Sequence, residues 1–557
     1  MIGGIYIMAN LKLTEEQKVA IWKARIERGK DYAQKNFWEG AKEDIKFFSG
    51  DHFEGLGLSK DTDLLTINYT WSIVKSLIPQ TYYEDPYIKL TAQSPNWVES
   101  RQLAEDYLNY CWKKMKIKRQ LRKIILDWYV TGLGVRKLGY FQETVKNTNL
   151  ETAKEYSFLV KDEYPYFLRQ SPLDVIVDPE AKNLDDIRWL AARYYVPIDD
   201  LQSRESLKYK GVENLKGKHM PEDLLGKKFE EIDSDIRRVE LWEIEDYVDN
   251  KILTLSGESG KFLRDIENPY FQLCDIKSNY GLLYNNEIPD KPYPQSDVFN
   301  LKRLNQEYNK TRTQIMQHRK KSQRKIVYED GVFATDEELA KFLNDEDLVP
   351  AKVVREGVGK IAIFSAVTPD ANLYDYCGAI LFDMNNIARS GFNQRAVEAP
   401  TEKTATEASI IEKNAQLGNA ERLDVMTDFI IDTARELLAI LQKFPSEEKK
   451  FYVERRREWQ TFRREDIAGD YGVNIEVGAV QKKDSLESIQ RANDVFSLLI
   501  NLTDIDESTG QERLLVDRER LARWTVEKYG LREDEVEKLI REKSKIPPKE
   551  IATLTKR

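Results

Sequence analysis

The feature that most constrains this chain is a long helical run with little apolar surface, predicted from about Ser296 to Gln323. Between Leu301 and Lys325 the run carries nine Lys and Arg side chains against one acid, Glu307. A helix with so narrow an apolar stripe is not expected in the core of a monomer, so it should bridge, line a surface or pack against copies of itself. Its apolar residues recur at roughly helical spacing: Phe299, Leu301, Leu304, Tyr308 and Ile315.

The length and composition predict a folded, multidomain, soluble protein. A chain of 557 residues is too long for one core, and roughly three to five domains are expected. No run approaches the ~18 apolar residues of a membrane span, and the first ten residues lack the basic region of a signal peptide, so we expect a cytoplasmic product. Three widely spaced cysteines, Cys111, Cys274 and Cys377, indicate packing residues and not a disulfide framework or a zinc site.

Before the long run, helices and strands alternate. Thr14 and Gln17 form a predicted capping box that opens a helix reaching about Phe48. Two further helices are expected from about Trp97 to Met115 and from Ile117 to Val130, the second stopped by glycines. Strands are predicted over 135–140, 156–178, 239–247 and 251–255, and the segment 268–294 is expected to be a long connection.

After the long run, the chain is expected to form a compact α+β insert between two long helices. The insert holds a predicted hairpin of 326–329 with 332–333, a short helix from Thr335, and strands over 349–354 and 360–364. A second long helix follows over about 370–390. Thr404 and Glu407 form a predicted capping box for a third helix that reaches about Lys443 and kinks near its middle. Strands over 450–453 and 473–480 and a charged helical tail over 485–543 complete the pattern.

The sequence shows no motif of a known catalytic or cofactor site. It has no phosphate loop, no His-Glu-x-x-His and no paired Cys or His ligands, and its three histidines lie in separate segments. We therefore expect neither an enzyme nor a cofactor or metal. Asp174, Asp178 and Glu180 could bind a metal, although turn residues at strand ends are the simpler interpretation. A nuclease site built from scattered carboxylates stays open as the alternative.

A basic patch ends the long run, and two interpretations of it stay open. It is either a solvated helix end, where the helix dipole favours cations, or a contact for nucleic-acid phosphates or an acidic partner. The net charge of −9 argues against a general nucleic-acid coat, so this patch is local. Its residues are His318, Arg319, Lys320, Lys321, Arg324 and Lys325.

The order of elements resembles the portal proteins of tailed bacteriophages, the head-to-tail connectors. The stretch from Tyr293 to Thr313 is similar to the start of that family's first stem helix. Thr404 to Glu407 resembles the start of its long wing helix, and Asn68 to Pro86 resembles its early wing region. These short motifs, in this order, span most of residues 60–480.

The resemblance implies a helix-rich α+β fold divided into wing, stem, clip, tunnel loop and crown. The implied segments are the first wing part over 1–290, stem helix 1 over 291–323, the clip over 324–367, stem helix 2 over 368–393, the tunnel loop over 394–403, the remaining wing with its long kinked helix over 404–480, and a C-terminal helical crown over 481–557.

The resemblance also implies a function. Family members form a homo-oligomeric ring, usually a dodecamer, at one capsid vertex of the virion after assembly in the host cytoplasm. Double-stranded DNA passes through the channel during genome packaging and ejection, without sequence specificity. The ring contacts the terminase, head-completion or adaptor proteins, and the major capsid or scaffolding protein, and no membrane. Another virion structural protein is a further alternative.

The resemblance places one loop nearest the DNA. Because two of its members are acids, direct phosphate contact by this loop is not implied by charge. The loop comprises Ala396, Val397, Glu398, Ala399, Pro400, Thr401, Glu402 and Lys403.

Overall fold

A computed structural model shows a chain of mixed helix and strand, which confirms the α+β class. It describes residues 13–53, 64–83, 85–146, 158–183, 186–203, 209–217, 237–270, 278–321, 325–329, 335–337, 340, 351–354, 361–364, 371–389, 405–446, 448–453, 458–475, 497, 503–505 and 512–514.

The chain forms two compact units. The first unit comprises Met1–Thr81 and Met115–Phe444, and the second comprises Tyr82–Lys114 and Pro445–Arg557. The boundaries fall inside the expected first wing segment and directly after the last long helix, so the closing strands lie in a different unit from that helix.

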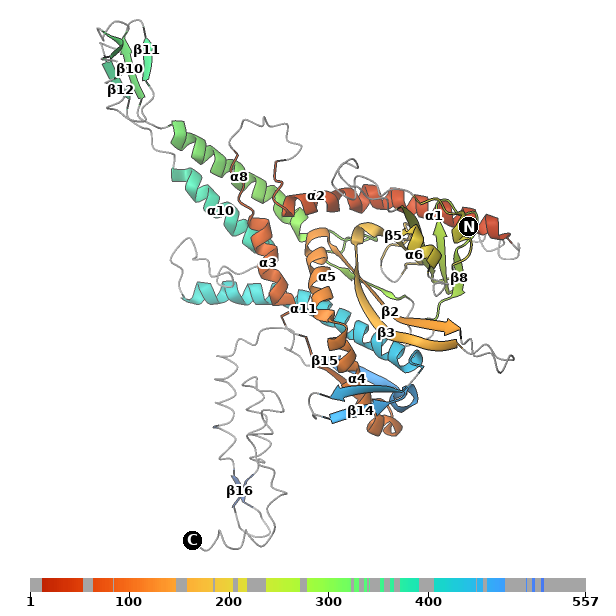
Figure 1. Ribbon diagram of the computed structural model, residues 1–557. Coiled ribbons are helices and arrows are strands. Elements are labelled where there is room, and N and C mark those ends of the chain that lie inside the picture. Colours follow the sequence, from red (N-terminus) through yellow and green to blue (C-terminus); the bar gives the residue numbers. More distant parts are fainter. Residues whose placement is uncertain are drawn as a thin grey trace, which may run out of the picture. The chain divides into compact units, whose positions relative to one another are not determined.

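The first unit begins with a helical rod that packs on a five-stranded antiparallel sheet (Figure 1). Thr14 caps the rod through both hydrogen bonds of the predicted capping box. Gly29 permits close approach, because a Cβ there would lie 3.0 Å from Trp189 Cη2. The rod consists of α1 (Glu15–Ala33), the π-helical turn η2 (Gln34–Trp38) and α2 (Glu39–Phe48); the sheet has the order β4 (Val175–Val177), β5 (Trp189–Pro197), β6 (Arg238–Asp246), β7 (Lys251–Ser256) and β8 (Arg264–Glu267).

A second, three-stranded sheet shares this core. It has the order β3 (Phe158–Gln170), β2 (Leu133–Lys146) and β9 (Tyr280–Tyr284), and α5 (Ile117–Thr131) packs on it. Gly132 ends α5 with a left-handed φ of 91°. The expectation that 268–294 is only a connection is wrong, since β9 lies within it and pairs antiparallel with β2. Buried Tyr and Leu side chains in that short run make it a strand.

Two long helices then flank a small sheet. Helix α8 (Asp297–Lys321) leads to the strands β10 (Lys325–Glu329), β11 (Ala351–Val354) and β12 (Ile361–Phe364), and α10 (Ala371–Ile387) follows. The predicted hairpin of 326–329 with 332–333 is wrong, because β10 is the central strand and both its edges pair, with β11 and β12. The third long helix, α11 (Ala405–Lys443), begins one residue after Thr404.

The second unit is smaller and has an aromatic core. Its helix α4 (Val98–Lys114) contacts β1 (Ile88–Ala92), which pairs with β15 (Tyr471–Ile475), and also contacts the hairpin of β13 (Lys449–Val453) with β14 (Glu458–Phe462). Tyr107 and Phe462 have ring centroids 3.8 Å apart. Cys111 is a buried free thiol, and burial raises its pKa to about 12, as predicted for a packing residue.

The C-terminal tail is not purely helical as expected. The strands β16 (Thr503–Ile505) and β17 (Glu512–Leu514) pair antiparallel. Gly510 between them and the β-branched Thr503 and Ile505 suit a hairpin. The rest of the predicted helical crown lies outside the described residues, apart from Ser497, which is helical.

Candidate interface surfaces of the helix pair

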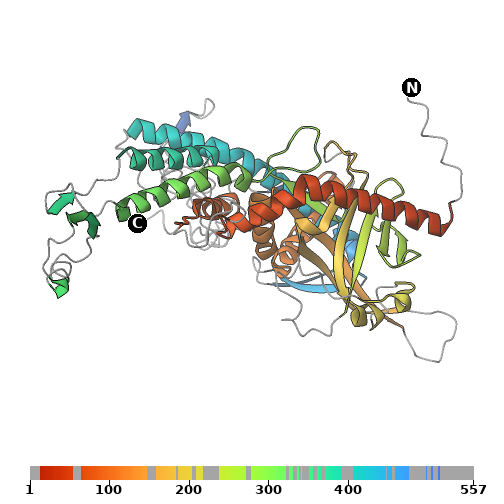
Figure 2. The same ribbon diagram turned by 90° about the horizontal axis from the view of Figure 1, so that it is seen from above.

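Helices α8 and α10, here called the helix pair, run side by side in opposite directions (Figure 2). The broad apolar stripe expected on α10 extends from Leu373 to Ala388 and includes Tyr376 and Ile387, and only part of it is buried. Cys377, Ile380 and Met384 are at most 6% exposed, and on α8 Leu301, Tyr308 and Ile315 are buried equally well. The two expected long helices therefore bury part of their stripes within one chain, while Phe299, Tyr376 and Ile387 stay exposed.

One arginine of α11 joins the two helices where they meet the rest of the unit. Arg422 Nη2 donates to Asp297 Oδ2 over 3.1 Å, and Asp297 is the first residue of α8. Arg422 Nη1 donates to the carbonyl oxygen of Ala388 over 3.0 Å, directly after the end of α10. Both charged side chains are at most 10% exposed. A single buried guanidinium thus connects α11, the start of α8 and the end of α10.

The start of α8 is also tied to α2. Ser296 Oγ accepts a hydrogen bond from Phe299 N over 2.9 Å, as an N-cap does, and donates to Asp44 Oδ2 over 2.5 Å. Lys302 Nζ lies 2.9 Å from the other Asp44 oxygen. Burial raises the pKa of Asp44, and the Ser296 and Lys302 donors act against that rise.

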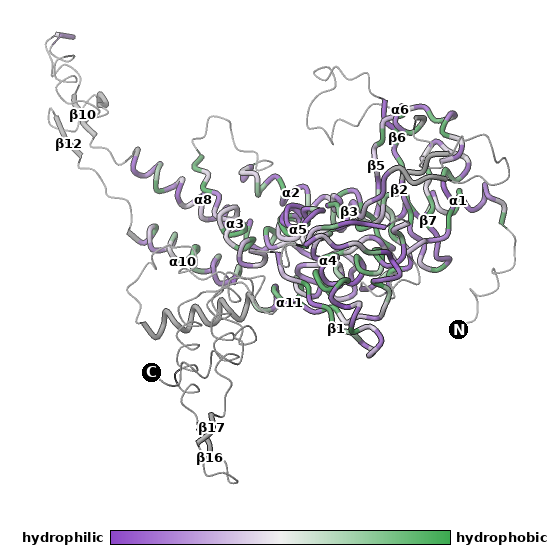
Figure 3. The backbone as a smooth tube through the Cα atoms, turned by 60° about the horizontal axis from the view of Figure 1, so that its bottom comes forward, coloured by the Kyte–Doolittle hydropathy of each residue, from purple (hydrophilic) through white to green (hydrophobic). Residues whose placement is uncertain are grey.

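Hydrophilic residues recur along α8 (Figure 3), and a row of them is buried. Asn305, Asn309 and Thr313 lie four residues apart on one face. They accept hydrogen bonds from the backbone N–H groups of Thr70, in the first turn of α3 (Tyr69–Thr81), and of Ile67 and Leu65, in the irregular segment before it. Asn305 and Asn309 are fully buried. The prediction that α8 is too polar for the core of a single chain is therefore wrong for this part of the helix. The side chains of this row accept the backbone hydrogen bonds that a neighbouring strand would otherwise accept.

His52 also contacts the polar row of α8. Asn309 Nδ2 donates to His52 Nδ1 over 2.7 Å, and the ring stacks on Phe47 with centroids 4.0 Å apart. Burial lowers the pKa of His52, which favours the neutral imidazole that can accept this hydrogen bond. This histidine serves packing.

The predicted basic patch is only partly within the described side chains. His318 and Arg319 are exposed on the last turns of α8. Lys320 and Lys321 end the helix and Lys325 begins β10, but their side chains, and all of Arg324, lie outside the described part. The predicted tunnel loop, Ala396 to Lys403, and the side chains of Thr404 and Glu407 lie outside it as well.

Exposed apolar side chains lie on both flanks of the buried stripe of α10. Tyr376 and Ile387 belong to the expected stripe, whereas the exposure of Tyr374 on the other flank was not predicted. Tyr374, Tyr376 and Ile387 are each 48% exposed and Phe382 is 38% exposed. At about 100° of rotation per residue, Tyr376 and Ile387 lie roughly 80° to one side of the stripe and Tyr374 lies roughly 80° to the other, whereas Phe382 lies nearly opposite it. The helix pair therefore offers two different apolar surfaces.

A buried cluster of ionisable groups lies between the five-stranded sheet and the β3-β2-β9 sheet. Lys137 Nζ on β2 lies 2.5 Å from Glu243 Oε1 on β6 and 3.1 Å from Tyr194 Oη. Tyr280 Oη donates to the same Glu243 oxygen over 2.7 Å. Burial alone would lower the pKa of Lys137 and raise that of Glu243, but their mutual attraction reverses both shifts.

A second carboxyl group near this pair behaves differently. Glu245 is fully buried, and burial raises its pKa to about 8. It accepts hydrogen bonds from Ser278 Oγ and from Asn279 N. Since Lys137 is held as a cation and Glu245 as a neutral acid at pH 7, neither is a free base. The arrangement joins the two sheets.

The three carboxylates weighed as a metal site have structural partners. Asp174 accepts from Arg193 Nη2 over 2.8 Å, and Asp178 Oδ1 accepts from the backbone N–H of Glu180 over 3.1 Å, as in a turn. The Glu180 carboxylate pairs with Arg28 at the surface. Turn and strand-end roles, the simpler of the two interpretations, are confirmed for Asp174 and Asp178. In the parts of the chain that the structure describes, no group of three or more His, Cys, Asp or Glu residues is placed to hold a metal ion.

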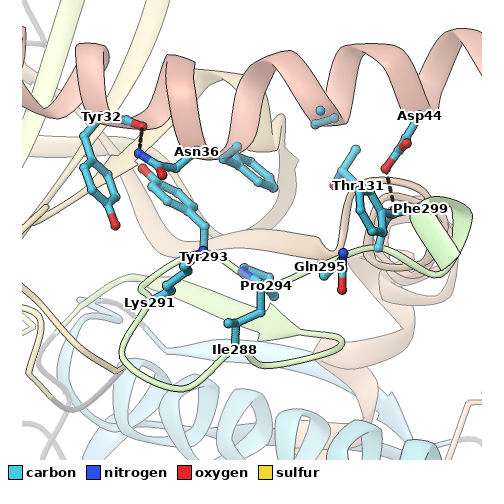
Figure 4. Close-up of a pocket in the computed structure, with 14 residues that line it drawn as sticks. Tyr32, Asn36, Asp44, Thr131, Ile288, Lys291, Tyr293, Pro294, Gln295 and Phe299 are labelled. Carbon is cyan, nitrogen blue, oxygen red and sulfur yellow. Dashed lines mark hydrogen bonds between the residues drawn. The ribbon is translucent and has the colours of Figure 1, made fainter.

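A small pocket of about 150 Å³ lies beneath the helical rod (Figure 4). Tyr32, Phe37 and Tyr293 form an aromatic wall, with Phe37 and Tyr293 stacked at 4.9 Å. Asn36 Nδ2 is already engaged by the carbonyl oxygen of Tyr32. The arrangement packs the rod on the loop before α8.

No helix within the described ranges is long and apolar enough to cross a bilayer. Neither a scan against models of protein families nor a search of curated proteins finds a match for this chain.

Proposed function

We propose that this chain is the subunit of a portal ring, which forms the channel for DNA packaging and ejection at one capsid vertex. The observation that carries the proposal is the pair of apolar flanks on α10. A closed ring of identical subunits needs two different surfaces on each copy, because every interface joins the front of one copy to the back of the next. Tyr376 and Ile387 supply one surface, and Tyr374 supplies the other.

The order of elements supports the same proposal. Helix α8, a small sheet and the returning helix α10 correspond to stem, clip and stem of the portal architecture, and α11 corresponds to the long wing helix. In this function double-stranded DNA passes through the axis without sequence specificity. The basic end of α8 docks the terminase or meets DNA, and adaptor and capsid or scaffolding proteins bind elsewhere on the ring. The terminase hydrolyses ATP, so the subunit itself needs neither catalysis nor a cofactor.

The mass of the purified chain tests the proposal. We expect an assembly near twelve copies of the 65.1 kDa chain, with an axial hole in negative-stain images. A monomer or dimer that cleaves duplex DNA with Mg²⁺ would overturn the proposal and favour the nuclease alternative.

Single substitutions on α10 test the surfaces. Ile387→Asp and Tyr374→Asp each place a carboxylate on one apolar flank, and each is expected to reduce the ring fraction at least about tenfold. Asn386→Asp is the matched control, since Asn386 is exposed nearly opposite the buried stripe. Rings that form equally well with all three variants would show that the flanks are not the interface.

A further inference from the structure

The outer face of α5 carries a cluster of cations. Its opposite face, which includes Ile117, Leu121, Ile124 and Trp128, is completely buried. The sequence from Lys113 to Leu126 contains no acid. The cluster, here called the α5 basic face, comprises Lys116, Lys118, Arg119, Arg122 and Lys123.

This cluster is unfavourable for the isolated chain. Cations at the start of a helix oppose the helix dipole. Like charges four residues apart, as at Lys118 with Arg122 and at Arg119 with Lys123, repel one another. Among the residues that the structure describes, no carboxylate forms an ion pair with any of the five. An external anion would relieve this repulsion.

The same unit carries an acidic row on α11. Four acids lie on one face: Glu421, Asp424, Asp428 and Asp432. Glu421 pairs with Arg389 and Asp432 with Arg435. Asp424 and Asp428 are exposed and form no ion pair with a described residue.

We propose that the α5 basic face of one copy binds the α11 acidic row of the next copy, an inference that rests on the proposed ring. The charges are complementary, and the rows share a spacing: Arg119 to Lys123 and Asp424 to Asp428 each advance four residues, about 6 Å along a helix. Both rows are exposed in one chain, so they are available to a neighbour. The net charge of −9 favours a protein partner over a nucleic acid, which the rest of the surface repels.

Charge reversal in two separate variants tests the contact on the full chain. The first is Arg119→Glu with Lys123→Glu, which places acids at a helix start where the dipole favours them. The second is Asp424→Lys with Asp428→Lys. Each variant alone brings like charges together at every interface, and we expect its ring fraction to fall at least about tenfold at low salt.

Mixing the two variants gives the decisive measurement. Every junction of an alternating ring then joins either two native rows or two reversed rows, and both combinations are complementary. We expect rings to return with equal numbers of the two variants and an even subunit count by native mass spectrometry. Lys18→Glu with Lys35→Glu carries the same change in charge at exposed positions on the rod, and it should assemble as the wild type does.

The outcomes separate this contact from the ring itself. A wild-type chain that forms no ring overturns the proposed function. Wild-type rings with normal assembly of both reversed variants, or with no recovery on mixing, overturn this contact alone. A first variant that still assembles but no longer binds duplex DNA overturns it too and assigns the α5 basic face to nucleic acid.

Discussion

Arg422 is the buried cation through which α11 holds both members of the helix pair. Its removal leaves Asp297 buried without its partner and the Ala388 carbonyl without its donor. Breaking a buried pair in this way costs about 3–5 kcal/mol. We expect Arg422→Ala to raise hydrogen exchange in α8 and α10 by a corresponding factor.

Arg435 supplies the control for that experiment. It lies on the same helix and pairs with Asp432 at the surface over 3.1 Å. Exposed pairs contribute at most about 1 kcal/mol, so Arg435→Ala should leave exchange in the helix pair nearly unchanged. Equal effects of the two substitutions would argue against the joining role of Arg422.

Glu245 predicts a pH dependence of stability in the first unit. The pKa of this carboxyl group rises from 4.5 to about 8 on folding. The folded chain therefore holds a proton that the unfolded chain releases between these values, so the contribution of this group to stability is greatest below pH 4.5 and is lost as pH rises toward 8. A tenfold difference in proton affinity between the two states corresponds to about 1.4 kcal/mol.

The variant Glu245→Gln removes the titration and keeps the shape of the side chain. We expect its thermal midpoint to change less than that of the wild type between pH 5 and 8, and to be higher at pH 8. Glu267→Gln, at an exposed position of β8, should follow the wild type. A wild type and Glu245→Gln variant with parallel pH profiles would contradict the assignment.

At the scale of elements, the polar row of α8 holds the irregular segment 64–68 and the first turn of α3. Asn309→Ala removes the acceptor of Ile67 N and the donor to His52, and leaves buried polar groups unpaired. Such losses cost about 1–3 kcal/mol. Faster hydrogen exchange or proteolysis of residues 64–70 in Asn309→Ala would show this loss of stability. Asn300→Ala, exposed on the same helix, should have no such effect.

The long helices were predictable, because their apolar spacing and caps persist over many residues. The predicted ends of α5 and α10 lie within a few residues of those in the structure. Short buried strands such as β9 were not predictable, since five residues are too few to establish a period. The four-residue spacing of Asn305, Asn309 and Thr313 indicates in the sequence that these polar residues share one helix face. An analysis of apolar positions alone does not detect this pattern.

The contacts made by Arg422 and by Lys137 with Glu243 had no local signal at all. Their charged partners lie more than 100 residues away in sequence, and nothing in either neighbourhood distinguishes these residues from the many surface charges. Tertiary packing alone selects which charges become buried. The candidate surfaces on α10 likewise depend on which of its apolar residues α8 leaves uncovered.

At the scale of the whole molecule, substitutions in the basic patch distinguish ring assembly from terminase docking. Replacing Lys320, Lys321, Arg324 and Lys325 with Glu is expected to spare the ring, because the apolar flanks of α10 are untouched, and to weaken terminase docking by reversing the local charge. Packaging yield and a terminase pull-down measure the two effects. An unchanged yield would contradict the docking role.

A control for position, with half the change in charge, exists on the same helix. Arg303→Glu with Lys310→Glu reverses two exposed cations nearer its start, and it should leave terminase binding intact.

A channel through which DNA slides gains nothing from many phosphate contacts, since each adds affinity and salt-dependent retention. An acidic chain with a few local cations fits that requirement.

The attachment of both members of the helix pair to one guanidinium has a mechanical consequence. A rotation of α11 displaces Asp297 and Ala388 together, because the two acceptors share the same donor group. We then expect the two helices of the pair to tilt together about Arg422 without separating from each other. Torque applied to α11 would reach the far ends of α8 and α10 as a single coordinated displacement.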